Sequence, residues 1–283
     1  MNRSPTSTNR LPTTPSPLDS RSRALRRAIV RVVEASRRGH IGSAFSLVEI
    51  LRVLYDDILR YDPSRPRWPD RDRCVFSKGH GCLALYVILA EKGFFPAHEL
   101  TRFCQDDGIL GGHPEYGKIP GVEASTGSLG HGLSLAIGMA LGARQAHAGH
   151  RVFAVISDGE CNEGATWEAA LCASKHRLSN LTAVLDYNQQ QSYSTTHEVL
   201  ELDPLADKWS AFGWEVREAD GHDVNQLQLA LRPVPFHPEK PSLLICHTIK
   251  GKGVSFVENN LKWHHKSKIS DMEVRALLAE LEG

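Results

Sequence analysis

Asp158 and Asn188 stand just after two apolar segments, and their side-chain oxygens could bind a magnesium ion. Asp158 follows the run 152–156 and Asn188 follows the run 181–185. The two residues are 30 positions apart, which is enough for one helical crossover, so adjacent parallel strands could bring the two side chains together. Carboxylate and amide oxygens suit Mg²⁺, which completes its shell with phosphate oxygens and water, and Gly159 lets the backbone come close. A turn aspartate and a loop asparagine would explain the same residues without a metal.

Two glycine-rich stretches could bind an anion. Residues 111–115 (Gly-Gly-His-Pro-Glu) lead into 121–132, which opens an apolar helix, and residues 77–81 (Ser-Lys-Gly-His-Gly) follow a short strand. A helix N-terminus offers backbone N–H groups to an anion, and Lys78 and His80 could face phosphates. The alternatives are a flexible turn with a helix cap and a surface histidine, because neither stretch has a dinucleotide-binding or P-loop pattern.

Alternating apolar runs and amphipathic segments predict the scaffold that positions these loops. Strand-helix alternation indicates an α/β fold, a doubly wound and mainly parallel sheet with helices on both faces. Gly39 is expected to end the first helix and residues 62–63 (Asp-Pro) to stop the second. Strands are predicted at 74–76, 152–156, 181–185, 214–218 and 242–246, and helices at 19–39, 46–59, 81–91, 97–105, 129–147, 164–176, 204–211, 223–231 and 269–281.

The polar, basic segment 1–18 is expected to be a disordered tail, with a transit peptide as the alternative, and 19–283 a single domain. The 33 basic and 33 acidic residues cancel, which argues against a nucleic-acid-binding protein. No apolar run is long enough for a membrane span, and the first residues contain no secretory signal. Six cysteines without a CxxC pair indicate reduced thiols in a cytoplasmic protein.

Taken together, the motifs resemble the N-terminal, diphosphate-binding part of a transketolase, from about residue 20 to residue 266. The Asp-Gly to Asn pair is the thiamine diphosphate signature of that family, and the other motifs follow in the family's order. They lie at 39–42 (Gly-His-Ile-Gly), 77–80, 112–115, 120–130, 158–164, 188, 250–256, 258–260 and 262–264.

The resemblance assigns roles to residues of this chain. It implies that Asp158, Asn188 and the main-chain carbonyl of Gln190 bind Mg²⁺, and that Gly159 lies against the diphosphate. His80 and the loop of Gly127, Ser128, Leu129 and Gly130 should touch the cofactor. Glu163 and Glu168 match acids placed at the family's subunit interface, Glu163 beside the cofactor, although a capping or surface carboxylate is the alternative for Glu163. The predicted catalytic histidines around the substrate are His40, His80, His113 and His264.

Four departures from the family pattern leave the substrate preference open. Ser157 stands where glycine is usual before the motif aspartate, His131 where glutamine is common, and Gln189 where glycine is common. Residues 81–82 are Gly-Cys in place of a small Ala-Ser pair. The positions expected to bind the metal are unchanged. The roles of Lys78, Lys250 and Lys252 are left undecided between function and structure.

The resemblance also implies that this chain is one half of a split enzyme. In transketolases a glutamate on the pyrimidine-binding domain activates the cofactor, and that domain follows the segment ending near Lys266. We therefore expect a separate C-terminal subunit to supply it in a heterotetramer. The expected reaction is transfer of a two-carbon ketol unit from a ketose, usually a phosphate, to an aldose.

Three alternatives stay open at this point. One is another thiamine diphosphate-dependent reaction, either a deoxyxylulose-phosphate synthase-like condensation or an acyloin or ketol transfer on a natural-product intermediate. A second is a non-catalytic scaffold protein, against which the intact Asp158, Asn188 and histidines argue. A Mg²⁺-dependent phosphatase with Asp158 as its nucleophile is the weakest.

Overall fold

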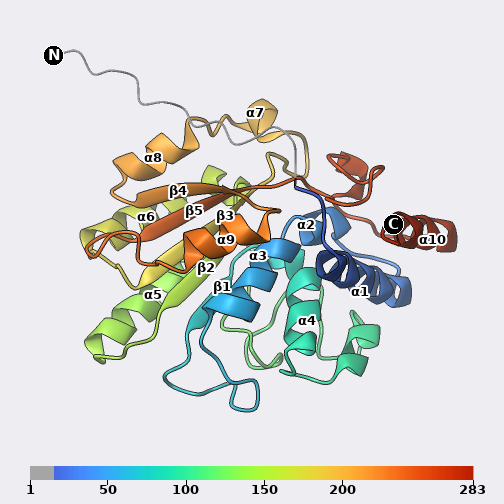
Figure 1. Ribbon diagram of the computed structural model, residues 1–283, viewed down its shortest axis with the longest axis horizontal. Helices are drawn as coiled ribbons and strands as arrows, with labels where there is room; N and C mark the ends of the chain where they lie inside the picture. The colour runs from blue at the N-terminus through green and yellow to red at the C-terminus, as the bar shows by residue number, and fades with distance from the viewer. Residues whose placement is uncertain (1–15, 283) are drawn as a thin grey trace.

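Five parallel strands form one sheet at the centre of the folded molecule (Figure 1). The structure is a computed structural model that describes residues 16–282. The order across the sheet is β1-β2-β3-β5-β4, and every neighbouring pair is parallel. All carboxyl ends therefore lie along one edge, as predicted. The strands are β1 (Arg73–Phe76), β2 (Val152–Ser157), β3 (Leu181–Tyr187), β4 (Glu215–Asp220) and β5 (Ser242–His247).

Alternate residues of the strands enter two separate hydrophobic cores. In β2, Val152, Ala154 and Ile156 join one core, whereas Phe153 and Val155 join the other. This alternation follows from the two-residue period of a strand whose two faces are both buried. The near-continuous apolar runs in the sequence are thus explained by helices that cover both faces of the sheet.

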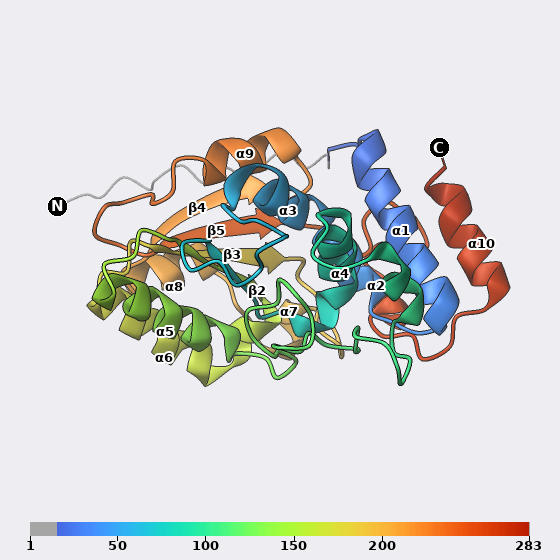
Figure 2. The same cartoon turned by 90° about the horizontal axis from the view of Figure 1, so that it is seen from below.

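Helices cover the sheet in layers of unequal depth (Figure 2). One face carries α5 (Gly132–Gln145), α6 (Gly164–Lys175) and α8 (Leu205–Ala211). The other carries α3, α4 and α9, with α1 and α10 packed beyond α4. The remaining bounds are α1 (Ser20–Ser36), α2 (Ile41–Phe45), α3 (Val48–Val53), α4 (Cys82–Glu91), α7 (Thr196–Val199), α9 (Val224–Leu231) and α10 (Asp271–Glu280).

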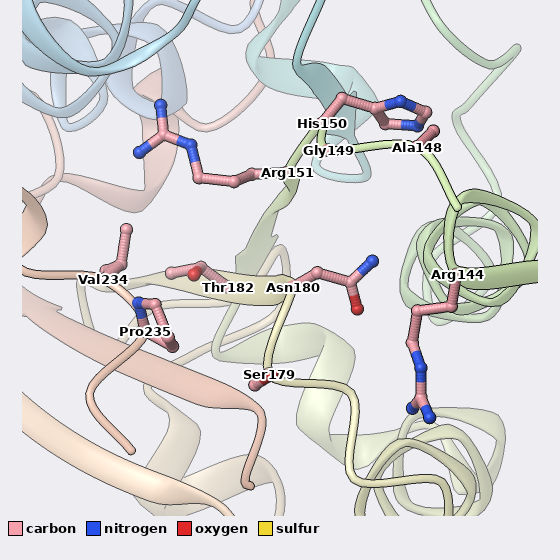
Figure 3. A pocket seen from close by; sticks show the side chains of 10 residues that line it. All are labelled: Arg144, Ala148, Gly149, His150, Arg151, Ser179, Asn180, Thr182, Val234 and Pro235. Carbon is pink, nitrogen blue, oxygen red and sulfur yellow. The ribbon is translucent and has the colours of Figure 1, made fainter. Parts of the chain in front are cut away.

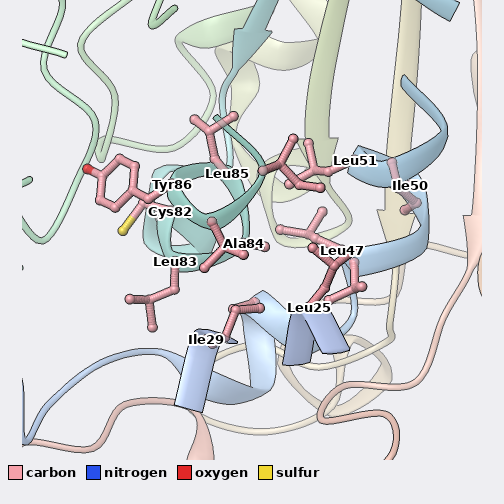
Figure 4. Close-up of a cluster of buried hydrophobic side chains, with 14 of the residues drawn as sticks. Leu25, Ile29, Leu47, Ile50, Leu51, Cys82, Leu83, Ala84, Leu85 and Tyr86 are labelled. Atoms are coloured by element: carbon pink, nitrogen blue, oxygen red, sulfur yellow. The ribbon is translucent and has the colours of Figure 1, made fainter. Parts of the chain in front are cut away.

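Helix α4 is apolar all round because other elements surround it. Every residue from position 82 to position 90 is buried. Leu25 and Ile29 of α1 pack on one side, and Ile50 and Leu51 of α3 pack on another (Figure 4). A helix with no polar face belongs in a core, and α4 fixes the loop 77–81 from which it starts.

The structure corrects several predicted helix ends. Helix α1 ends at Ser36 rather than Gly39, because Arg37 adopts the left-handed cap at φ 61° and its N–H bonds the Val33 carbonyl. The second predicted helix begins earlier and is divided into α2, α3 and a π-helical turn, Leu54–Ile58, which ends before residues 62–63. The segment predicted as a helix at 97–105 is a 3₁₀ helix, Ala97–Arg102, and the short α7 was not predicted.

The predicted tail, 1–18, lies mostly outside the described residues. Residues 16–18 of this segment are described, and the Oγ of Ser16 donates a hydrogen bond to Asp220 Oδ2 at 3.1 Å. The single-domain boundary at residue 19 stays a prediction. Within residues 16–282, no helix combines the length and hydrophobicity required to cross a bilayer.

Candidate active site

The loops that follow β2 and β3 meet at the carboxyl edge of the sheet. Asp158 directly follows β2, and its Oδ2 accepts a hydrogen bond from the backbone N–H of Gln189 at 2.6 Å. Its Oδ1 accepts from the N–H of Gly159 at 2.7 Å. Asn188 follows β3, and its Oδ1 accepts from the N–H of Gln190 at 3.1 Å. The structure thus brings together the segments predicted to bind a metal.

Burial and a neighbouring acid make the anionic form of Asp158 unfavourable unless a cation compensates its charge. Asp158 is 1% exposed, and burial together with the nearby charge of Asp186 raises the pKa of its carboxyl group. Lys78 and Lys250 only partly offset this effect. A buried carboxylate is stable as an anion when a cation or hydrogen-bond donors compensate it. The oxygen donors at 158, 188 and 190 match the chemistry of Mg²⁺.

Asp186, which the sequence reasoning missed, orients the predicted metal ligand Asn188. The Nδ2 of Asn188 donates to Asp186 Oδ2 at 3.1 Å, which fixes which end of the amide is the oxygen. Asp186 also pairs with Lys78 and accepts from Ser46 Oγ at 2.7 Å. Lys78 is therefore used inside the protein and does not face a phosphate. A carboxylate within an apolar strand was the signal that could have found this pair.

Lys250 links residues 188–190, here called the metal segment because they are predicted to bind the metal ion, to the predicted catalytic histidines. Its Nζ donates to the carbonyl oxygen of Gln190 at 3.0 Å and lies 2.7 Å from Nδ1 of His264. Burial first, and then the charge of Lys78, lower the pKa of Lys250. The sequence left the role of Lys250 open, and the structure places its ammonium group beside the predicted metal-ligand carbonyl.

The four predicted catalytic histidines form one cluster around His40. The centroid of the His40 ring lies 5.6 Å from His80, 6.3 Å from His113 and 5.7 Å from His264. Burial is the main cause that lowers the pKa of His40 to about 4 and that of His264 to about 3. Burial lowers the pKa of His80 and His113 as well. Neutral imidazoles both donate and accept hydrogen bonds, which suits contacts with sugar hydroxyls. His265, which was not predicted, lies 4.6 Å from His40.

The glycine-rich loop at 127–130 is held by a second missed carboxylate, Glu160. Its Oε1 accepts from the N–H of Gly130 at 3.0 Å and from Ser77 Oγ, and its Oε2 accepts from the N–H of Ser157 at 2.9 Å. The loops 77–81 and 127–130 also pack too tightly for a larger residue, since a Cβ on Gly79 would lie 2.8 Å from the nitrogen of Gly127. Nothing in the sequence separated Glu160 from an ordinary turn acid.

The same loop borders a hollow at the start of α5. This hollow has a volume of about 510 Å³ and is lined by Ser128 but not by Leu129. The carbonyl oxygen of Leu129 lies 3.0 Å from Nδ1 of His131. Gly130 adopts φ 81°, and a Cβ there would lie 2.7 Å from Cβ of Glu163. The predicted cofactor loop therefore opens toward the surface formed by α5 and α6.

Glu163 and Glu168 are both exposed on this surface. Gly159 has space around it, because the nearest atom to an added Cβ would be Gln191 Cγ at 3.7 Å. Nothing else in the described chain fills that space. Its openness is consistent with the close approach of a ligand that was predicted for Gly159.

A separate hollow of about 230 Å³ lies at the opposite, amino edge of the sheet (Figure 3). Its cations are already used elsewhere, because Arg144 bonds the carbonyl of His176 and Arg151 pairs with Asp72 at 2.7 Å. It lies at the starts of β2 and β3, away from every predicted site residue. Ligands of open α/β sheets bind at the other edge, where the candidate site is.

Comparison with known proteins decides the family. Residues 19–282 match the family model of the transketolase thiamine diphosphate-binding domain. The chain belongs to this family. It is 42% identical over 248 residues to one subunit of the apulose-4-phosphate transketolase of Phocaeicola vulgatus, covering 88% of both chains. It is 43% identical over 244 residues to a 6-deoxy-6-sulfo-D-fructose transketolase subunit of a Clostridium species, covering 86% of this chain and 88% of the relative.

Solved transketolases have the same fold over part of their length. The Leishmania mexicana enzyme matches with a TM-score of 0.88 at 26% identity, over 95% of this chain and 42% of its own. The Campylobacter jejuni enzyme matches with a TM-score of 0.86 at 29% identity. The chain thus spans about two fifths of the length of these solved transketolases. The predicted fold, the transketolase resemblance and the thiamine diphosphate-binding domain are confirmed.

Proposed function

We propose that this chain is the diphosphate-binding subunit of a two-component transketolase that works with thiamine diphosphate and Mg²⁺. The observation that carries the proposal is the meeting of Asp158 with the segment 188–190 at one sheet edge, joined through Lys250 to the histidine cluster. One half of this arrangement suits a metal-bound diphosphate, and the other half suits a polyhydroxylated substrate.

Asp158, Asn188 and the carbonyl of Gln190 would hold the magnesium ion. Asp158 supplies the charged oxygen, and Asp186 keeps the amide of Asn188 turned so that its oxygen faces the loop. Gly159 and the loop 127–130 would receive the diphosphate, since Gly159 has space around it and Ser128 of the loop lines a hollow. When bound, thiamine diphosphate supplies the electron sink for a two-carbon ketol unit.

His40, His80, His113 and His264 would bind the sugar and move its hydroxyl protons. Burial keeps His40 and His264 neutral near pH 7, so each ring can donate at one nitrogen and accept at the other. The contact from Lys250 Nζ to His264 Nδ1 leaves the Nε2 of His264 to donate toward the substrate. These side chains therefore position hydroxyl groups without carrying a charge into the site.

The partner would be a C-terminal subunit carrying the pyrimidine-binding domain and the activating glutamate. Two relatives covered over most of their length are themselves named as transketolase subunits. The surface of α5 and α6 exposes Leu135 at 44% and Leu171 at 56%, beside the exposed carboxylates of Glu163 and Glu168. Exposed apolar side chains can take part in an interaction surface, and we propose that this surface is used in a heterotetramer.

The substrates would be a sugar phosphate or a similarly charged ketose as donor and an aldose as acceptor. The relatives' names mention apulose 4-phosphate and 6-deoxy-6-sulfofructose, and similar transketolases have been solved with fructose 6-phosphate and sedoheptulose 7-phosphate. We propose a cytoplasmic location, which the six free thiols support.

The function is tested by mixing the chain with its partner and assaying ketol transfer from these four ketoses to an aldose. Measurable transfer from at least one donor, dependent on thiamine diphosphate, is expected. Condensation with loss of carbon dioxide from a keto acid, in place of ketol transfer, would assign the complex to another thiamine-dependent reaction. Absence of both would make a non-catalytic scaffold the better account.

The metal assignment is tested by calorimetry on the same complex. Asp158→Ala should abolish Mg²⁺-dependent binding of thiamine diphosphate, because it removes the charged ligand. The matched control is Asp207→Ala, an exposed aspartate of α8 that is not among the proposed ligands. Unchanged affinity in Asp158→Ala would refute the assignment.

A further inference from the structure

His265 is a fifth imidazole of the histidine cluster. Its ring is the nearest of all to His40, with centroids 4.6 Å apart and planes inclined at 33°. The centroid distances from His40 to the other three rings of the cluster are 5.6 to 6.3 Å. Unlike His40 and His264, His265 is exposed.

A short antiparallel pairing holds His265 in this place. Gly39 donates to the carbonyl of Lys266 at 3.0 Å, and Lys266 donates to the carbonyl of Gly39 at 3.1 Å. In an antiparallel pair the next residues, His40 and His265, stand opposite each other with their side chains on the same face. The N–H of Ile269 extends the contact by donating to the carbonyl of Arg37 at 2.9 Å. The ring contact therefore follows from backbone pairing.

His265 is the outer end of a series that starts at the metal segment. The carbonyl of Gln190 accepts from Lys250, Lys250 contacts His264, and His264 lies 5.7 Å from His40. His265 comes next and reaches solvent. A sugar whose reacting carbons lie near the inner histidines would extend its far end toward His265.

The chain around His265 is basic. Residues 261–270 contain three lysines and two histidines and no acid. Lys262 and Lys268 are exposed, whereas Lys266 pairs with Glu273 at 2.7 Å. A surface of this charge attracts an anion more than a neutral group.

We propose that His265 contacts the terminal anionic group of the sugar and so sets the preference for charged over uncharged substrates. The inference rests on the proposed function and adds to it a residue that the family motifs did not include. His265 acts on substrate binding, because it is separated from the metal segment by His40, His264 and Lys250. The terminal group is defined by its chemistry, a phosphate or sulfonate at the end of the carbon chain.

The test compares His265→Ala with the unchanged chain, each assembled with the partner subunit. The donors are fructose 6-phosphate and 6-deoxy-6-sulfofructose, with fructose as the uncharged match. The substitution should raise KM for the charged donors about tenfold, because a hydrogen bond to a charged group is worth about a decade in affinity. The kcat, the KM for fructose and the affinity for thiamine diphosphate should stay unchanged. His265→Lys should retain the preference, and His98→Ala, an exposed histidine elsewhere, should have no effect.

Three results would overturn the inference while leaving the proposed function intact. These are an unchanged KM for the charged donors, an equal rise in KM for fructose, and a fall in kcat or cofactor affinity. A complex of the unchanged chain that transfers no ketol unit from any donor would instead overturn the proposed function, and the inference with it.

Discussion

The two helical layers of this chain are built differently. On the side of α1, α3 and α9, charged groups are buried and fully paired inside the protein. On the side of α5 and α6, Leu135 and Leu171 are exposed together with the carboxylates of Glu163 and Glu168. The first layer contains a buried and paired charge network, whereas the second carries the surface that we propose meets another protein.

The buried network of the first layer consists of Arg26, Glu49 and His222. Arg26 donates to Glu49 at 2.6 and 2.9 Å, and the Nδ1 of His222 lies 2.9 Å from Glu49 Oε2. Arg26 also donates to the carbonyl of Lys252 at 2.7 Å, and His222 accepts from the N–H of Ile249 at 2.8 Å. The network thus ties α1 and α3 to the loop that carries Lys250 into the site.

Breaking this network should have the largest effect. Glu49→Gln leaves Arg26 buried without a counter-charge and should cost about 3–5 kcal/mol of stability. The matched control is Glu34→Gln, whose exposed pair with Arg31 should be worth under about 1 kcal/mol. Urea unfolding measures both. A loss below about 1 kcal/mol in Glu49→Gln would show that the first layer does not depend on the network.

A pair of leucine truncations compares the layers directly. Leu85→Ala, in the buried α4, should cost about 2–5 kcal/mol because it leaves a cavity. Leu171→Ala, on α6, should change the stability of the isolated chain by no more than about 0.5 kcal/mol. Thermal unfolding of the two variants is the measurement. Equal losses would mean that Leu171 is covered within the chain.

Acid should weaken the first layer through Glu49. Burial alone would raise its pKa, but the charge of Arg26 outweighs burial and holds the pKa of Glu49 well below its usual value of 4.5. A lowered pKa gives stability that is present above pH 4.5 and is lost as the pH falls. Between pH 5 and pH 3 the unchanged chain should lose about 2 kcal/mol more than Glu49→Gln. Parallel urea titrations check this, and identical acid profiles would contradict it.

A charge on the second layer should affect assembly and leave the fold unchanged. Leu171→Asp should weaken association with the partner about tenfold, which is about 1.4 kcal/mol, with little change in unfolding of the isolated chain. Leu229→Asp, at an exposed position of α9, is the control, since that helix covers the other face. Sedimentation of the mixed subunits gives the affinities. Equal weakening by both substitutions would move the interface away from α5 and α6.

The sequence predicted the sheet well because every strand except β4 is buried on both faces and so reads as a short apolar run. Helix ends were less predictable. Arg37 takes a left-handed conformation that usually belongs to glycine, and the π turn after α3 has no sequence signal.

The site was predicted from motifs, and its missing members are those defined by packing. Glu160 acts through buried hydrogen bonds that no local pattern reveals, and the only signal for Asp186 was a carboxylate within an apolar strand. His265 was missed because its place depends on pairing between residues 39 and 266, which are distant in the chain. Contacts of this kind come from the fold and not from spacing.

The central claim is that this chain holds the diphosphate half of an active site that a partner completes. The most direct measurement is ketol transfer by the purified chain alone and after mixing with the partner, both with thiamine diphosphate and Mg²⁺. We expect no turnover by the chain alone and turnover on mixing. Equal turnover by the isolated chain and by the mixture would contradict the claim.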